Sequence, residues 1–390
     1  MFIIKKTIRV KLGILIYSLA GGGAERVVSY IVSYCIEKGI EVHLVLMNSS
    51  IDYDLPEGLQ ISYIEKSEGD ENGIMKAIKI PILAYKYAKL TKKLKLTHSL
   101  SFMARPSFIN IFASKLTTYK FKVITNERAY PSLQYSYKGI QSTFNKSLIR
   151  ILYKESDLVI SNSYGNANDL VDNFKVPSNK MKVIHNPIDL DKIKSIEANT
   201  SLFDTEKFNL ITLGRLDRGK NHEMLIRAVH RLQNPKVHLY IFGVGELQEY
   251  LELLIGELGI NDQVKLMGFN PNPYQYLKAA DLFLFGSNHE GFPNVLLEAM
   301  ACGLPILSTN CQSGPSEILK LETEREDLMI TDYGILVPIK NMELMAKGIN
   351  YYVSHQEYAE NCRINGENRI RDFEKDHILK AYIDLIKSTT

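Results

Sequence analysis

The chain has 390 residues, of which 45% are hydrophobic and 23% are charged, an ordinary globular composition that is sufficient for two domains. Its four cysteines show no CxxC or metal-ligand spacing, which argues against a disulfide framework and favours a reducing cytosolic setting. No apolar run reaches the roughly 18 residues of a transmembrane helix, and LGILIYSLA near the N-terminus leads into a glycine-rich turn, as in a first βα unit rather than a signal peptide.

Short apolar runs typical of strands alternate with helical patterns along the chain. In chain order the strand patterns are LGILIYS, EVHLVLM, FKVITN, DLVISNS, FNLITLG, VHLYIFG, QVKLMGF, DLFLFGS and PILSTN. Helical patterns lie between them, notably at 24–38, 222–232, 247–258 and 294–301. This alternation predicts parallel sheets with crossover helices, and a polar break at 189–207 separates two such series.

We therefore predict an α/β fold with two Rossmann-like, doubly wound domains that face a central cleft. The predicted boundaries are 1–190 for an N-terminal domain, 191–373 for a C-terminal domain and 374–390 for a last helix that packs back on the N-terminal domain. Ligands of such sheets bind beyond the carboxyl ends of the strands, and the motifs below lie there.

The first motif, LAGGGAERVV, joins the first strand pattern to the first helical pattern. Its glycines, Gly21, Gly22 and Gly23, allow a ligand to approach the backbone closely, although a plain tight turn is the alternative. The motif lacks GxGxxG spacing, and VLMNSS stands where a dinucleotide-binding domain carries an acid after its second strand. These two absences argue against a nicotinamide-dependent dehydrogenase.

The second motif, GRLDRGKNHEML, follows the strand pattern FNLITL and places Arg215 and Lys220 between a strand exit and a helix. Two cations at such a place suit a diphosphate, whose charge must be stabilised when it leaves. The alternative is a solvated loop with two surface charges.

The third motif, HEGFPNVLLEAMACG at 289–303, holds two acids with seven residues between them, Glu290 and Glu298. Glu290 lies in the loop after the strand pattern DLFLFGS, and Pro293 suits the first position of the following helix, whose N-terminus favours an anion. Glu298 has apolar neighbours, and an acid in that setting usually has a designated partner. We expect Glu290 to contact sugar hydroxyls and Glu298 to accept from a ribose diol, with an exposed helix position as the alternative for Glu298.

The stretches GGGAERV, GRLDRGKNHEMLIRAV and EGFPNVLLEAMACGLPIL resemble the retaining, nucleotide-sugar-dependent glycosyltransferases of family four, which have a GT-B fold. The likeness covers nearly the whole chain, and the paired acids with the upstream Arg and Lys are specific to it. Within the family, NPYQYL and EGFPNVLLEAMAC are among the stretches similar to the PglJ-type GalNAc transferases, which extend undecaprenyl-diphosphate-linked glycans. O-antigen and capsule enzymes share much of this pattern.

The resemblance implies roles for the motif residues. Arg215, Lys220 and Glu290 form the catalytic set, in which the two cations hold the donor diphosphate and Glu290 contacts the donor sugar. Glu298 is expected to bind the ribose. The other implied donor-binding positions are Gly22, Gly23, Gly243, Gly268, Gly291, Phe292, Pro293 and Asn294. Gly243 and Gly268, which each follow a strand of the second series, would flank the uracil. Gly22 and Gly23, in the first glycine-rich turn, would lie near the phosphates and the acceptor.

One departure from the family follows the strand FKVITN. Many relatives carry a Glu-His pair there, whereas this chain has Glu127 and Arg128 in ITNERAY. The role of that His therefore does not transfer, and we assign Glu127 and Arg128 only to acceptor binding. Because GT-B enzymes need no metal, the resemblance implies no metal and no cofactor besides the UDP-sugar donor.

Charge is unevenly distributed, since the chain has a net charge of only +3 while 76–155 contains 16 Lys and Arg against 2 Glu, a net +14. Within LAYKYAKLTKKLK, the lysines Lys86, Lys89 and Lys93 share one helical face. Apolar residues on another face are Leu83, Tyr87, Leu90 and Leu94. We predict an anionic membrane surface as the partner rather than nucleic acid. A core-facing helix with a solvated basic side is the alternative.

These observations predict a peripheral enzyme at the cytoplasmic face of the inner membrane. It would move a HexNAc, with α-linked GalNAc as the expected sugar, from a UDP-sugar to an undecaprenyl-diphosphate-linked saccharide with retention of configuration. No clear carboxylate nucleophile is visible, so the donor phosphate is expected to help deprotonate the acceptor. The alternatives are an O-antigen or capsule transferase with another UDP-sugar and a non-catalytic nucleotide-binding module.

Overall fold

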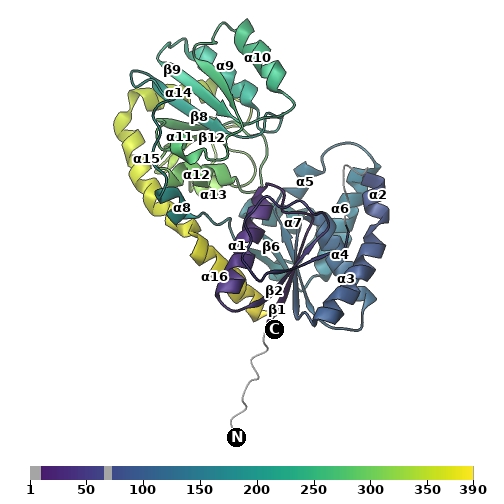
Figure 1. Ribbon diagram of the computed structural model, residues 1–390. Helices are drawn as coiled ribbons and strands as arrows, with labels where there is room; N and C mark the ends of the chain where they lie inside the picture. Colours follow the sequence, from purple (N-terminus) through teal and green to yellow (C-terminus); the bar gives the residue numbers. More distant parts are fainter. Residues whose placement is uncertain (1–9, 66–72, 390) are drawn as a thin grey trace. The chain divides into compact units, whose positions relative to one another are not determined.

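The computed structural model describes residues 10–65 and 73–389, which form two compact units (Figure 1). The first unit comprises Met1–Pro187 together with Asp376–Thr390, and the second unit comprises Ile188–Lys375. The chain thus leaves the first unit, builds the second and returns to the first with its last helix. The boundaries predicted from the sequence lie at 190 and 373.

The first unit is built on a parallel sheet with the strand order β3-β2-β1-β4-β5-β6-β7. Its strands are β1 (Lys11–Ile16), β2 (Glu41–Leu46), β3 (Gln60–Tyr63), β4 (His98–Phe102), β5 (Lys122–Glu127), β6 (Leu158–Ser161) and β7 (Met181–Val183). Its helices are α1 (Gly23–Glu37), α2 (Gly73–Ile78), α3 (Ile80–Leu94), α4 (Ala104–Leu116), α5 (Pro131–Gln134), α6 (Ile140–Leu152), η1 (Tyr153–Glu155), α7 (Tyr164–Asp172), η2 (Ser178–Lys180) and α16 (Lys375–Ser388).

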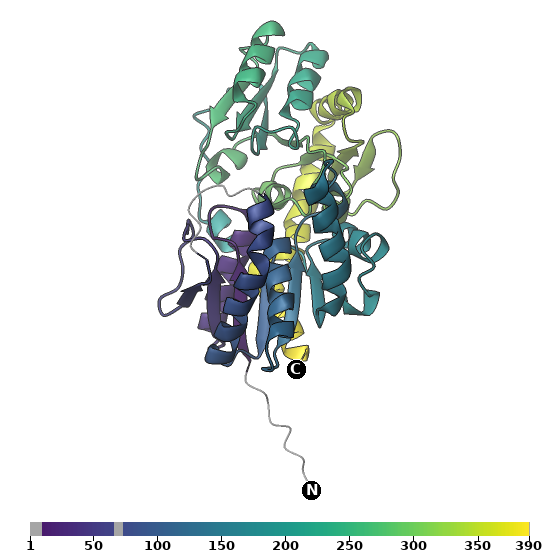
Figure 2. The same cartoon turned by 90° about the vertical axis from the view of Figure 1, so that its right-hand side faces the viewer.

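Helices cover both faces of this sheet, so its inner strands are apolar on both sides. On one face, α1 and α16 pack over β1 and β2, and the buried side chains of α16 include Leu379, Tyr382 and Ile383. On the other face, α3, α4 and α6 cover the sheet, and Figure 2 shows the blue helices α3 and α4 in front of its strands. The last helix is therefore an integral part of the core of the first unit.

The second unit repeats the architecture with the strand order β10-β9-β8-β11-β12-β14-β13, in which only β13 is antiparallel. Its strands are β8 (Phe208–Leu213), β9 (Val237–Phe242), β10 (Val264–Gly268), β11 (Leu282–Phe285), β12 (Ile306–Thr309), β13 (Met329–Thr331) and β14 (Gly334–Val337). Its helices are α8 (Leu190–Lys194), α9 (His222–Leu232), α10 (Gln248–Glu257), α11 (Tyr274–Leu277), α12 (Asn294–Ala301), α13 (Pro315–Ile318), α14 (Met342–Ser354), α15 (Gln356–Arg369) and η3 (Ile370–Phe373).

These two parallel, helix-covered sheets confirm the predicted α/β class with two Rossmann-like domains. Every strand pattern identified in the sequence forms a strand of one of the sheets. In the part of the chain that the structure describes, no helix is both long and apolar enough to cross a membrane.

The predicted apolar face of the helix at 80–94 is a core face, which is the arrangement given above as the alternative, a core-facing helix with a solvated basic side. Leu83 and Tyr87 are buried against the sheet, and the Tyr87 hydroxyl lies 2.6 Å from Ser99 Oγ of β4. The apolar side chains that α2 and α3 expose instead are Met75, Ile78, Ile82 and Tyr85. A periodic pattern shows that a helix has an apolar face, but it does not show what covers that face.

Candidate functional site

The loop after β8 carries two of the predicted catalytic residues, and it is held by the neighbouring loop after β9. A Cβ on Gly243 would lie 1.9 Å from the carbonyl oxygen of Gly214, so the two loops approach more closely than any other residue would allow. The Leu216 N–H donates to Val244 O at 3.1 Å, and the Leu247 N–H donates to Leu216 O at 2.9 Å. This backbone network fixes the segment from which Arg215 projects.

Lys220 forms the central ion pair of the site. Its Nζ lies 2.5 Å from Glu290 Oε1, which also accepts a 2.8 Å hydrogen bond from the Ser287 hydroxyl. The Lys220 N–H donates to Asp217 Oδ1 at 2.9 Å, which fixes the turn before α9. The Lys220 side chain is 24% exposed, so its ammonium is shielded from water but still accessible to a ligand. The structure thus joins the second and third sequence motifs at one point.

The Arg215 side chain is much more exposed to solvent than that of Lys220. Its side chain is 83% exposed, and its Nε lies 3.5 Å from Asp217 Oδ2. An exposed ion pair of this kind contributes little stability, about 0–1 kcal/mol, so the guanidinium can move to a ligand at small cost. Arg215 and Lys220 together place a mobile cation and a fixed cation at the carboxyl end of β8.

His222, which sequence reasoning did not select, lies beneath this loop. The imidazole is buried, and a Cβ on Gly214 would lie 3.5 Å from its Nε2. Burial lowers the pKa of His222 to about 4, so the ring is neutral at physiological pH and adds no charge to the two cations. The sequence signal that could have selected His222 is a polar residue at the first position of a helix whose next turn is apolar.

The loop after β11 presents the N-terminus of α12. Pro293 is the N-cap and not the first helical residue, and α12 begins at Asn294, as the helical pattern at 294–301 predicts. The N-cap residue forms no side-chain capping hydrogen bond. The Ser313 hydroxyl donates to Gly291 O at 2.7 Å, and a Cβ on Gly314 would lie 2.4 Å from Pro293 Cδ. The turn before α13 therefore supports the turn that presents α12 to an anion.

The other residues of this motif face inward. Phe292 is buried and its ring lies 5.6 Å from that of Phe373, so only its backbone can contribute to a ligand site. Glu298 is also buried, and the Tyr274 hydroxyl donates to its Oε1 at 3.4 Å. A carboxylate enclosed in this way is held by specific partners, so the alternative of an exposed helix position for Glu298 is wrong.

The two glycines expected at the uracil lie side by side at the ends of β9 and β10. The Gly243 N–H donates to Gly268 O at 2.8 Å, and both residues have positive φ angles, 149° and 70°. Nothing lies within 4 Å of a Cβ built on Gly268, whereas Gly243 faces the backbone of Gly214. The glycine at 268 thus borders open space, and the glycine at 243 is required by packing.

In the first unit, the glycine-rich turn ends at Gly22, the N-cap of α1. The Tyr53 hydroxyl accepts from the Gly22 N–H at 3.1 Å and donates to Gly22 O at 2.7 Å, which pins the turn. No side chain caps α1, whose first residue is Gly23. The predicted phosphate-approach position therefore has a fixed backbone, and the Glu25 carboxylate of the first turn lies over it, with Oε2 2.2 Å from a Cβ built on Gly22.

Glu127 and Arg128, at the carboxyl end of β5, are buried in the first unit. Glu127 accepts from the Tyr153 hydroxyl at 2.6 Å and from the Arg128 and Ala129 N–H groups at 2.9 and 3.3 Å. Burial raises the pKa of the Glu127 carboxyl, which these bonds oppose. With 0% exposure, Glu127 has no surface for an acceptor, so its expected contact with one is replaced by a structural role.

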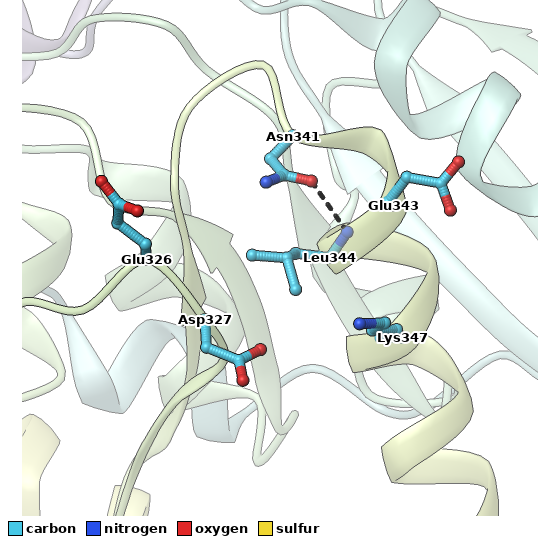
Figure 3. Close-up of a pocket in the computed structure, with 6 residues that line it drawn as sticks. All are labelled: Glu326, Asp327, Asn341, Glu343, Leu344 and Lys347. Atoms are coloured by element: carbon cyan, nitrogen blue, oxygen red, sulfur yellow. Dashed lines mark hydrogen bonds between the residues drawn. The ribbon is translucent and has the colours of Figure 1, made fainter.

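The second unit also has a pocket away from these motifs. It is lined by Glu326, Asp327, Asn341, Glu343, Leu344 and Lys347, where Asn341 caps α14 (Figure 3). None of the predicted site residues lines it. Across residues 10–65 and 73–389, no group of three or more His, Cys, Asp or Glu is arranged to hold a metal ion.

Comparison with known proteins identifies the family. Residues 21–192 match the family "Glycosyltransferase Family 4", and residues 194–369 match "Glycosyl transferases group 1". Over 370 residues the chain is 38% identical to the N-acetylgalactosamine-N,N'-diacetylbacillosaminyl-diphospho-undecaprenol 4-alpha-N-acetylgalactosaminyltransferase of Campylobacter jejuni, which covers 95% of this chain and 97% of that one. The chain belongs to this family of glycosyltransferases, as predicted.

Two further proteins extend the comparison. A Campylobacter jejuni GalNAc-alpha-(1->4)-GalNAc-alpha-(1->3)-diNAcBac-PP-undecaprenol alpha-1,4-N-acetyl-D-galactosaminyltransferase is 28% identical over 185 residues, 46% of this chain and 48% of that one. The crystal structure of Anabaena HepE in complex with UDP matches with a TM-score of 0.79 and 18% identity, over 97% of this chain and 100% of that chain. The likeness to HepE concerns the fold, which is GT-B. The protein is thus a glycosyltransferase with this fold.

Proposed function

We propose that the protein transfers an N-acetylhexosamine, with GalNAc in α-linkage as the expected sugar, from a UDP donor to an undecaprenyl-diphosphate-linked saccharide. The observation that carries the proposal is the Lys220–Glu290 pair beside Arg215 and the N-terminus of α12. This arrangement offers positive charge to a diphosphate and a carboxylate to sugar hydroxyls. The relative at 38% identity, which acts on such a lipid-linked saccharide, supports the choice of acceptor.

In the proposed reaction, the bond between the anomeric carbon and the β-phosphate oxygen breaks, and UDP leaves with the electron pair. The acceptor oxygen bonds to the anomeric carbon on the same face, so configuration is retained, and its proton passes to a phosphate oxygen. Lys220 and Arg215 stabilise the charge on the leaving diphosphate. Glu290 already accepts from Lys220 and Ser287, which makes it a poor nucleophile and a good acceptor for sugar hydroxyls.

The test is UDP release from UDP-GalNAc, UDP-GlcNAc, UDP-galactose and UDP-glucose, each with and without a short polyprenyl-diphosphate-linked saccharide. We expect release to be fastest with an N-acetylhexosamine donor and to depend on the acceptor. Tight UDP binding without any release would favour a non-catalytic module. Fast release with a hexose donor alone would favour a surface-polysaccharide transferase that uses another sugar.

We further propose that the first unit binds the anionic surface of the inner membrane from its cytoplasmic side, with the exposed face of α2 and α3 as the contact. Ile78, Ile82 and Tyr85 are 60%, 59% and 53% exposed there, beside the exposed lysines Lys86 and Lys89. Exposed apolar side chains next to basic ones suit the boundary between headgroups and acyl chains. Each lysine near such a surface is worth about 1 kcal/mol, which salt screens over roughly 8–10 Å.

Co-sedimentation with vesicles tests the membrane proposal. The wild type should bind vesicles that contain anionic lipid more than neutral vesicles, and high salt should release part of it. Replacement of Lys86, Lys89 and Lys93 by Glu should abolish the preference for anionic vesicles. The control replaces three exposed lysines of the second unit by Glu, namely Lys236, Lys265 and Lys347. This control variant has the same change in charge and should keep the preference. Equal binding to both vesicle types at low salt would refute the electrostatic part.

A further inference from the structure

Arg128 is a buried cation whose contacts are all with neutral groups or its own backbone neighbour. The residue is 8% exposed, its Nη2 donates to Asn186 Oδ1 at 2.5 Å, and its Nη1 donates to the Tyr382 hydroxyl at 3.4 Å. Among the described residues, no carboxylate forms an ion pair with this guanidinium. Glu25 and Glu127 act on the guanidinium only through space, because neither carboxylate accepts a hydrogen bond from it, although Glu127 accepts one from the Arg128 backbone N–H.

Arg369 of the second unit, whose side chain is 10% exposed, shows the usual alternative for a largely buried guanidinium. It pairs with the Asp372 carboxylate, and its Nε and Nη2 donate to the carbonyl oxygens of Ile318 and Glu317 at 3.0 and 2.7 Å. Its charge is therefore compensated within the protein. Arg128 lacks such compensation, although an arginine keeps its proton even when burial lowers its pKa.

The position of Arg128 explains what could supply the missing negative charge. It follows β5, and its Cζ lies 5.9 Å from the ring of Phe102, the last residue of the neighbouring strand β4. Met103, which follows Phe102, is the N-cap of α4 and has φ 71°, and no side chain caps that helix. Beyond β4 lies β1, which leads to the uncapped N-terminus of α1 at Gly22. Arg128 and the N-terminus of α4 are thus two sources of positive potential at the same edge of one sheet, whereas the Glu25 carboxylate offsets the potential at the N-terminus of α1.

We propose that Arg128 binds the diphosphate of the lipid-linked acceptor, a role that rests on the proposed function. A guanidinium presents paired N–H groups that match phosphate oxygens, and neutral partners leave its charge available to them. The donor diphosphate is the other source of this chemistry. The acceptor is the better match, because the second unit already supplies Arg215, Lys220 and α12 for the donor.

Tyr382 is the positioning residue for this group. Its hydroxyl accepts from Asn126 Nδ2 at 2.9 Å and from Arg128 Nη1, and the side chain is completely buried between α16 and the sheet. Asn186 holds the other terminal nitrogen of the guanidinium. The last helix of the chain therefore fixes the direction in which the cation of the first unit points.

The experiment compares the full-length wild type with Arg128→Gln, Arg128→Lys and Tyr382→Phe. Calorimetry measures binding of farnesyl diphosphate, farnesol and UDP, and kinetics measure KM for a short polyprenyl-diphosphate-linked acceptor. Arg128→Gln should weaken farnesyl diphosphate binding and raise the acceptor KM by at least about tenfold while UDP affinity stays unchanged. Arg128→Lys should recover part of the loss, and Tyr382→Phe should raise the acceptor KM by about two- to fivefold without changing kcat.

Arg369→Gln is the matched control, because it also removes a largely buried guanidinium but lies in the second unit. It should lower the melting temperature and leave farnesyl diphosphate binding unchanged. Unchanged binding of farnesyl diphosphate by folded Arg128→Gln would overturn the inference, as would a loss confined to UDP. Because the binding arm needs no turnover, a wild type that binds farnesyl diphosphate through Arg128 but transfers no sugar would refute the proposed function alone.

Discussion

The carboxyl edges of the two sheets carry positive charge in opposite ways. In the second unit, Lys220 lies 2.5 Å from a carboxylate and Arg215 lies in solvent, whereas in the first unit Arg128 is buried among neutral oxygens. A cation with an internal carboxylate can exchange that partner for a ligand and return to it after the ligand leaves. A cation without an internal carboxylate is stabilised by any anion that binds to it. One fold thus supports both a reversible and a standing anion site.

The largest expected effect comes from breaking the exchangeable pair. Lys220→Ala removes the cation that stabilises the leaving diphosphate and leaves Glu290 bonded only to Ser287 within this cluster. We expect turnover to fall by about 10²–10³-fold, as for other groups that stabilise charge in a transition state. Rates of UDP release from a UDP-sugar with acceptor check this result. Arg218→Ala, an exposed cation of the same loop, should leave at least a third of the rate, and an equal loss in both variants would point to general loop charge.

A second prediction tests whether the second unit depends on close contact between its loops. Gly243→Ala places a Cβ 1.9 Å from Gly214 O at φ 149°, so the loop that carries Arg215 must shift. We expect a loss of about 3 kcal/mol or more in the free energy of unfolding. Gly256→Ala is the control, because it lies in α10 with nothing within 4 Å and should stabilise by about 0.5–1 kcal/mol. Denaturant titration measures both, and equal values for the two variants would contradict the packing argument.

The third prediction concerns the enclosed acid of α12. Glu298→Gln keeps the volume and the neighbour Tyr274 but removes the charge that a ribose diol would bond. UDP binding should weaken by about 1.5–3 kcal/mol while the fold survives. Calorimetry with UDP measures the affinity, and an unchanged value would show that Glu298 serves only the packing of α12.

The last prediction is a pH dependence of stability due to His222. Its pKa is near 6.5 in the unfolded chain and about 4 in the folded protein, so the unfolded state binds the proton more tightly. Stability should therefore be unaffected above pH 7 and should fall as pH decreases from about 6.5 towards 4, by at most about 1.4 kcal/mol per pH unit. The difference in unfolding free energy between wild type and His222→Gln should follow this slope. A difference that is constant between pH 7 and 4.5 would show that His222 does not titrate in this way.

Much of the fold could be predicted because most strands are continuous apolar runs. The strand β4, HSLSF, was missed because its serines interrupt the pattern, yet they are buried since Ser99 meets Tyr87 and Ser101 accepts from Asn110. The short strands β3, β7, β13 and β14 were also missed. Strands of three or four residues carry too little pattern to stand out.

Part of the candidate site could also be predicted from the sequence. Charges beside glycines mark loops at strand ends, so Arg215, Lys220 and Glu290 could be selected, and the structure brings Lys220 and Glu290 together. Burial and partners come from residues far along the chain, such as Tyr382 beside Arg128. The sequence therefore could not show that Glu127 is enclosed or that the guanidinium beside it lacks a carboxylate.

The return of α16 to the first unit has a consequence for biosynthesis. All strands of the first sheet are encoded by residue 183, but the core over α1 also contains Ile378, Tyr382 and Ile386. A nascent chain that has produced the first sheet still exposes that apolar surface while the ribosome translates the second unit. The first unit can complete its core, and orient Arg128, only when the last helix emerges. The second unit can therefore begin to fold before the first unit, although it is synthesised earlier, has finished folding.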